Sequence, residues 1–215
     1  VAIGSSIWVP ATLGSMGVLM ALSPTVAHQF GASGKIGPAS GESLRQSLWI
    51  AAGLAALTFV ALRNMTPLLQ LADVSDELIP GVEGYLKAVS WGSPGLMLFL
   101  ALRFLNEGSG NIRPILVINL LSIPANIVAN ALLMYGLLGL PALGAVGCGW
   151  ASALVMTLQA GLIINYTRVS PRFRLIGTIR LPRPDPDAIR TLLALGLPIG
   201  IGILLEAGLF TAVAV

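Results

Sequence analysis

One acidic residue, Glu206, interrupts the last apolar run of the sequence. Residues 189–215 read IRTLLALGLPIGIGILLEAGLFTAVAV, which is long and apolar enough for a membrane helix. A charged side chain inside such a helix costs about 2.5–3.5 kcal/mol on insertion scales, so a proton or a cation must compensate it. The other acidic residues fall in or beside polar connections. We therefore expect Glu206 to bind a proton, Na+ or an organic cation; the alternative is a carboxyl that stays protonated for structural reasons.

Two amides lie four residues apart in another apolar run. Asn126 and Asn130 belong to the run NLLSIPANIVANALLMY, which also holds Asn119. Residues four apart project from one face of a helix, so both amide oxygens can coordinate a hard cation or accept from a protonated carboxylic acid. Ser152, early in the next run, is expected to lie near them. Hydrogen bonding between helices is the alternative explanation of these amides.

The composition is that of a polytopic membrane protein. Of 215 residues, 55% are hydrophobic and only 10% are charged, against about 25% charged in soluble proteins. The net charge of +3 comes from basic residues scattered between apolar runs, which argues against a nucleic-acid partner. The sequence has one cysteine, Cys148, and one histidine, His28, so neither an internal disulfide nor a metal centre built from these ligands is expected. We expect no cofactor.

Six apolar runs predict an all-α bundle of about six membrane-spanning helices. The runs are bounded by polar, proline or glycine residues, and they cover residues 1–27, 47–62, 82–105, 114–135, 145–166 and 189–215. Residues 28–46 predict a polar connection, residues 136–144 a tight antiparallel hairpin, and the proline-rich residues 168–190 an irregular linker. Prolines inside four runs are expected to let the helices bend during a transport cycle: Pro10, Pro94, Pro124 and Pro198.

Lysine and arginine are distributed unevenly among the connections. The first, third and fifth connections hold ten of them, whereas the second and its margin hold two, Arg63 and Lys87, and the fourth holds none. Cytoplasmic connections of membrane proteins carry the excess of positive charge. We therefore predict that the odd-numbered connections, including residues 168–190, face the cytoplasm.

Four segments form a combined pattern that is more specific than any one of them. They are LMALSPTVAHQFGASGK, YLKAVSWGSPGLMLFLALRFLNEGSGNIRP, NIVANALLMYGLLGLPALGAVGCGWASA and LGLPIGIGILLEAGLF. Together they resemble the multidrug and toxic compound extrusion (MATE) family, of the bacterial NorM type. The resemblance implies a fold of twelve helices in two lobes, of which this chain is expected to be an internal fragment. Helices two to six would occupy residues 1–167, the inter-lobe linker residues 168–190, and helix seven residues 191–215.

The same resemblance implies roles for the polar residues inside the apolar runs. Glu206 matches an acidic residue of helix seven that takes part in cation coupling or substrate binding. Asn126 and Asn130 match a polar pair of helix five, which in relatives forms a cation site with an Asp of helix one and a hydroxyl of helix six. Ser152 is the nearest match to that hydroxyl, where Thr is common. Na+ is thus expected at Glu206 or at the asparagines, each site being incomplete without helices of the same polypeptide that lie outside this chain.

The expected function is secondary active efflux of organic cation drugs in exchange for Na+ or H+, by alternating access in a bacterial inner membrane, where membrane lipid surrounds the protein. The chain is not expected to be an enzyme. A lipid or oligosaccharide flippase is the nearest alternative, although such a protein should line its cavity with basic residues, and none lies in the middle of a run. An intramembrane lipid-linked transferase is supported less, because the sequence has neither a metal-binding acidic cluster nor a histidine constellation.

Overall fold

The computed structural model describes residues 2–71, 75, 77–139, 141–176 and 183–213. Within these ranges the chain forms nine α-helices and two short 3-10 helices, with no strand. The elements are α1 (Ala2–Met20), α2 (Leu22–Ser33), α3 (Pro38–Arg63), α4 (Thr66–Leu71), α5 (Ile79–Ser90), α6 (Ser93–Gly108), α7 (Arg113–Met134), η1 (Leu137–Gly139), α8 (Gly144–Val169), η2 (Pro171–Ile176) and α9 (Pro186–Val213). The predicted all-α class is confirmed.

Six membrane spans can be counted among these helices. α1 and α2 together form the first, at residues 2–33, and α3, α7, α8 and α9 are each long and apolar enough to cross a membrane. α5 and α6 pass the same test only as a pair, bent by 46°. The six spans follow the order of the six predicted runs, which confirms a multi-pass membrane bundle.

The expected polar connection at residues 28–46 is wrong in its extent. α2 continues to Ser33 and α3 begins at Pro38, which leaves only residues 34–37 between them. Gly34 ends α2 because its backbone has φ +67°, in the left-handed region that glycine adopts most easily, and its N–H donates to the Phe30 carbonyl at 2.7 Å. Pro38 then lies in the first turn of α3, where a backbone N–H has no partner within the helix, so the missing N–H of proline costs nothing.

The third span is broken where the sequence reads Trp91-Gly92-Ser93-Pro94. Pro94 lies in the first turn of α6, so its missing N–H costs nothing there. Gly92 lies against α8, since a Cβ on it would stand 2.8 Å from the Ala153 Cα. The other three prolines singled out, Pro10, Pro124 and Pro198, lie inside continuous helices. Their bending during transport stays a prediction.

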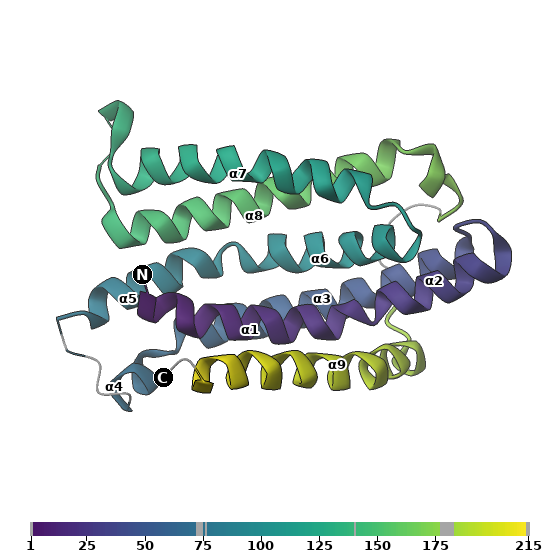
Figure 1. Ribbon diagram of the computed structural model, residues 1–215, viewed down its shortest axis with the longest axis horizontal. Coiled ribbons are helices and arrows are strands. Elements are labelled where there is room, and N and C mark those ends of the chain that lie inside the picture. The colour runs from purple at the N-terminus through teal and green to yellow at the C-terminus, as the bar shows by residue number, and fades with distance from the viewer. Residues whose placement is uncertain (1, 72–74, 76, 140, 177–182, 214–215) are drawn as a thin grey trace.

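The helices lie side by side, and α6 is central to their packing. Figure 1 shows α7 and α8 along one edge of the bundle, α9 along the opposite edge, and α1, α3 and α6 between them. α6 packs on α8, α3, α2 and α1. It also supplies several fully buried side chains of the core, namely Met97, Leu102, Phe104 and Leu105. The predicted hairpin is confirmed as the antiparallel pair of α7 and α8, with η1 in its turn.

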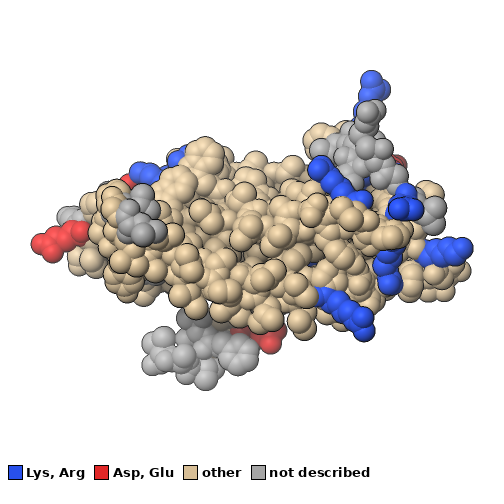
Figure 2. Space-filling model, turned by 90° about the horizontal axis from the view of Figure 1, so that it is seen from above, with Lys and Arg blue, Asp and Glu red and all other residues tan. Residues whose placement is uncertain are grey.

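Basic side chains gather at one end of the bundle. Figure 2 shows most lysines and arginines at the end where α2 meets α3, α6 meets α7 and α8 runs into η2. Arg63 and Lys87 belong to the opposite end, after α3 and in α5. Arg180 lies outside the described residues. The charge asymmetry expected from the sequence is thus present, and its orientation toward the cytoplasm stays a prediction.

α9 contacts the bundle mainly through glycines that face α1. A Cβ on Gly196 would lie 2.2 Å from the Val18 carbonyl oxygen, and one on Gly17 would lie 2.4 Å from the Gly200 Cα. The two backbones therefore touch without intervening side chains, as small residues allow in membrane bundles. This close approach sets the position of the candidate residue Glu206 relative to α1.

The expected irregular linker at residues 168–190 is partly helical. α8 extends to Val169, η2 follows at Pro171–Ile176, and α9 begins at Pro186, whereas residues 177–182 lie outside the described part. η2 packs on α3 through Ile176, which lies against Gly41, and on α8 through Phe173, whose ring contacts the Tyr166 ring edge-on. Arg45 Nη1 donates to the Ile176 carbonyl at 3.2 Å. The prolines of residues 168–190 predicted an irregular segment, but proline is also common at the start of helices, and both η2 and α9 begin with one.

Gln46 holds the start of α9 against α3. Its side chain is 1% exposed, its amide nitrogen donates to Glu42 Oε1 at 2.7 Å, and its oxygen accepts from the Asp185 backbone N–H at 3.0 Å. We expect Gln46→Leu to destabilise this contact by about 1–3 kcal/mol, because both partners lose a hydrogen bond. Hydrogen–deuterium exchange of the amides around Asp185 should become faster.

The matched control is Gln29→Leu, since the Gln29 amide donates to Ser43 instead, at 3.0 Å. Exchange around Asp185 should remain at the native rate in that variant. Equal acceleration in both variants would contradict the role of Gln46.

Candidate cation sites

Asn126 and Asn130 lie together on α7, as their spacing predicts. The Asn130 amide nitrogen donates to both the backbone carbonyl and the side-chain oxygen of Asn126, at 2.9 Å each. The prediction that they share a helix face is confirmed. The Asn130 side-chain oxygen accepts no hydrogen bond within the described part of the chain, and neither side chain is fully buried. This oxygen is therefore available to a ligand.

The antiparallel packing of α7 on α8 sets the level of Ser152. A Cβ on Gly147 would lie 2.2 Å from the Leu133 carbonyl oxygen, so these residues lie opposite each other. Further along, Ala129 packs with Ala151. Counting along the two helices from there, Ser152 lies at a level between Asn126 and Asn130.

Ser152 and the two asparagines also turn to the same side of the hairpin. Each asparagine follows an alanine of the interface by one position, Ala125 or Ala129, and Ser152 follows Ala151 by one position. In an antiparallel pair, a step of one residue rotates both helices toward the same side. The Ser152 hydroxyl donates to the Cys148 carbonyl at 3.0 Å, and no hydrogen bond joins it to either asparagine in the described ranges.

A second amide of α8, Gln159, extends this polar side. It follows Ser152 by two helical turns, and its amide nitrogen lies 3.5 Å from Asn119 Oδ1. Sequence reasoning missed Gln159, although the spacing of seven from Ser152 places both on one helix face. The hairpin therefore has one continuous polar side of amides and a hydroxyl.

These groups can coordinate a hard cation but do not complete its shell. Amide and hydroxyl oxygens are ligands that Na+-like hard ions accept, and the better-characterised hard cations take six or more. Asn126, Asn130 and Ser152 supply three oxygens. Where the chain is described, no group of three or more His, Cys, Asp or Glu side chains stands together as a metal centre. The remaining ligands must come from outside these helices.

Glu206 lies on α9, beyond the glycines that contact α1. A Cβ on Gly14 of α1 would lie 3.0 Å from Leu204 Cδ1, and Glu206 stands roughly 160° around α9 from Leu204. Its side chain is exposed, with no ion pair or hydrogen bond to the residues that the structure describes. The sequence predicts Glu206 roughly midway across the membrane. In the structure it lies six residues beyond the contact of Gly200 with Gly17, which is about 9 Å further from the basic end of the bundle. Its depth in the membrane stays a prediction.

The structure does not bring Glu206 and the asparagines into one site. α9 packs on α1 and α3, α7 packs on α8, and α1 and α6 lie between the two groups (Figure 1). Each candidate therefore belongs to a separate region of the bundle. This separation fits two sites better than one.

The fold and the candidate sites together define a class of protein, namely a multi-pass helical membrane protein with polar groups inside its spans. The family model described as MatE matches residues 1–132. The chain is 36% identical to multidrug resistance protein MdtK of Edwardsiella ictaluri and 37% identical to multidrug resistance protein NorM of Aliivibrio fischeri, in each case over its whole length. The chain therefore belongs to the MATE family of multidrug transporters, and the resemblance seen in the sequence is confirmed.

Solved structures share the fold. A chain described as the inward-facing conformation of a multidrug resistance MATE family transporter has a TM-score of 0.76 at 19% identity, and covers 94% of this chain and 44% of its own length. A MATE structure in complex with MaD5 has a TM-score of 0.80 at 19% identity, with 94% and 45% covered. The two curated relatives are matched over 47% and 46% of their lengths. This chain thus spans about half the length of its relatives.

Membership of a transporter family also confirms that the chain is not an enzyme. Its location in a membrane as a multi-pass protein follows from the family and from the six spans. The division of the chain into lobe, linker and first helix of a second lobe stays a prediction, as do the roles of the candidate residues.

Proposed function

We propose that this chain forms part of a secondary active multidrug antiporter in a bacterial inner membrane. The full protein exports organic cations in exchange for Na+ or H+ by alternating access between two lobes. Glu206, in α9, serves coupling or substrate binding in one lobe, and Asn126, Asn130 and Ser152 serve the other. The curated relatives are named multidrug resistance proteins of bacteria, which supports this location and substrate class.

The observation that carries the proposal is the amide pair in α7. The hydrogen bond between the two side chains uses an N–H of Asn130 and the oxygen of Asn126, so the Asn130 side-chain oxygen has no partner in the described structure. That oxygen stands at the level of Ser152, on the same side of the hairpin. A helix that holds oxygens in this way, without a fixed positive group beside them, is suited to a cation that binds and leaves.

The flippase alternative is supported less. Recognition of a lipid-linked phosphate requires basic groups that reach the cavity. Arg103 is paired with Glu107 at 2.7 Å and Lys87 with Glu83 at 2.8 Å, and both stand toward the ends of the third span. Arg168, which has no ion pair in the described residues, stands roughly 160° around α8 from Ser152 and so does not face the polar side of α7 and α8. That side consists of amides and a hydroxyl. These groups favour a cationic substrate.

Transport driven by a defined gradient tests the proposal. The full-length protein is reconstituted in liposomes, and uptake of ethidium is followed under an imposed Na+ gradient at constant pH or a pH gradient without Na+. We expect one of the two gradients to drive ethidium above its level in gradient-free liposomes. Equal ethidium movement with and without gradients would indicate a channel. Gradient-driven movement of a fluorescent lipid in place of ethidium would favour the flippase.

A further inference from the structure

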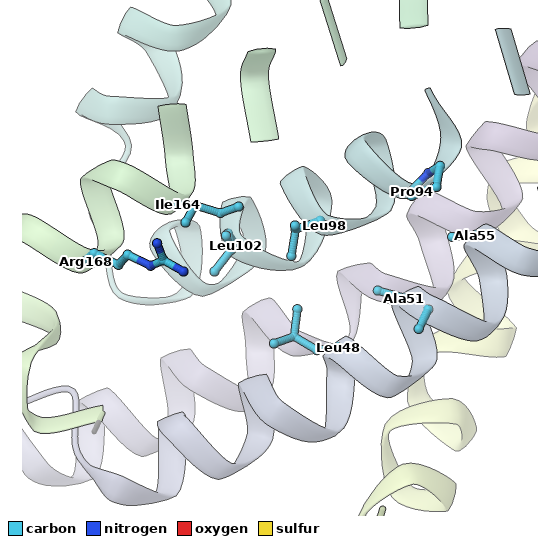
Figure 3. A pocket seen from close by; sticks show the side chains of 9 residues that line it. Leu48, Ala51, Ala55, Pro94, Leu98, Leu102, Ile164 and Arg168 are labelled. Atoms are coloured by element: carbon cyan, nitrogen blue, oxygen red, sulfur yellow. The ribbon is translucent and has the colours of Figure 1, made fainter. Parts of the chain in front are cut away.

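An apolar groove opens between α3, α6 and α8, away from the candidate cation sites. Its volume is about 330 Å³, which is within the range of small-molecule sites of roughly 300–1,000 Å³. The α3 wall consists of Leu48 and three small side chains, Ala51, Ala52 and Ala55, which leave the space open, and α6 forms the floor (Figure 3). The lining is apolar except at one end.

The polar end of the groove is Arg168, in the last turn of α8. Figure 3 shows its side chain extending from α8 toward Leu102 on the groove floor. Its guanidinium has no ion pair in the described residues. The three ion pairs found there are made by other basic residues, Arg45, Lys87 and Arg103. A guanidinium without a carboxylate at the mouth of an apolar groove is complementary to an anionic group attached to an apolar chain.

The groove has the length of one leaflet of a bilayer. Pro94, at its far end, lies at the middle of the broken span formed by α5 and α6. From Pro94 to Leu102 the floor rises along two turns of helix, about 12 Å, and half of the hydrocarbon core measures about 15 Å. The groove therefore runs from the level of the membrane centre to the end of the bundle that carries the basic residues (Figure 2).

Arg168 lies at the level expected for lipid headgroups. α8 has 26 residues, about 39 Å of helix, so its ends extend beyond a hydrocarbon core of about 30 Å. Arg168 is the next-to-last residue of this helix and stands roughly 160° around it from Ser152. The groove thus lies on the opposite side of α8 from the candidate cation site. A ligand there does not compete with the transported cation.

We propose that this groove binds an anionic phospholipid of the leaflet at the basic end of the bundle. One acyl chain lies between α3 and α8 over α6, and Arg168 donates hydrogen bonds to the phosphate. Basic residues between membrane helices at such an end are typical binding groups for anionic headgroups. The bound lipid fills the space beside the small side chains of α3 and holds α3 and α8 at their separation.

Lipid retention tests the proposal. The full-length protein is reconstituted in phosphatidylcholine bilayers that contain a minor fraction of phosphatidylglycerol, extracted, and examined by native mass spectrometry for the lipid that stays bound. Arg168→Gln should lower the retained phosphatidylglycerol about fivefold, the effect of one arginine near an anionic membrane surface. Arg168→Lys should retain more than Arg168→Gln, because it keeps the charge but loses the forked geometry.

Two further variants separate the groove from general surface charge. Arg174→Gln removes an exposed arginine at the same end that does not line the groove, and it should retain phosphatidylglycerol like the native protein. Ala52→Phe should fill the groove and reduce retention of both lipids. Equal losses for Arg168→Gln and Arg174→Gln, or native retention in Ala52→Phe, would overturn the proposal.

Discussion

Glu206→Gln should lower the initial rate of organic-cation efflux roughly tenfold or more, which corresponds to at least about 1.4 kcal/mol of lost coupling or binding free energy. Glutamine keeps the size of the side chain but can neither carry a negative charge nor release a proton. If the carboxylate balances Na+, a proton or the substrate in turn, the variant loses that exchange. The measurement is ethidium efflux from cells that express the full-length protein, in buffers with and without Na+, at matched expression in the membrane.

The control for this experiment is Glu77→Gln. Glu77 is an exposed acid in the connection before α5, outside the spans, so efflux should remain native. Native efflux in Glu206→Gln would show that the carboxyl has a structural role only. The assignment of coupling would then rest on Asn126 and Asn130. If the native protein exports ethidium equally fast with and without Na+ while a pH gradient is present, proton coupling is indicated.

Gly196→Val should destabilise the packing of α9 on α1 by about 1–3 kcal/mol or more, as expected for overpacking. A Cβ at Gly196 would lie 2.2 Å from the Val18 carbonyl oxygen and 3.0 Å from the Val18 Cα. Backbone atoms cannot move aside as a flexible side chain can, so the two helices must separate. We expect a lower midpoint of thermal unfolding for the full-length protein in detergent, together with reduced efflux.

Gly202→Val is a matched control on the same helix. No atom lies within 4 Å of a Cβ built on Gly202 in the structure, and the residue is exposed. Both variants change helix propensity equally, so a difference between their unfolding midpoints reports the contact with α1. Equal midpoints would contradict the close packing of α1 and α9.

The number and order of spans could be predicted from the sequence, whereas their ends could not. Apolar runs of about 20 residues require helices in a membrane because backbone groups cannot bond to lipid. Ser40 and Gln46 fall in the predicted polar connection, yet they are buried in α3. A sequence pattern cannot distinguish a polar residue in water from one buried by distant segments, and Gln46 is buried beside Asp185, which is 139 residues away.

The candidate sites were predictable to different degrees. A spacing of four fixes one helix face, so the contact of Asn126 with Asn130 followed directly. The position of Ser152 relative to them depends on the register of two helices, which the approach of Gly147 to Leu133 sets. Gly147 is one glycine among 25 in the sequence, so composition could not single it out.

The contact between α1 and α9 also has a consequence for biosynthesis. Gly17 and Gly196 are about 180 residues apart, and at typical translation rates roughly 10 to 40 seconds pass between their synthesis. During that interval α9 does not yet exist, so it cannot cover the glycine face of α1. Lipid, the insertion machinery or a transient partner must cover it until α9 is made. Slower synthesis of the connection before α9 should therefore lengthen the period in which α1 is exposed to misassembly.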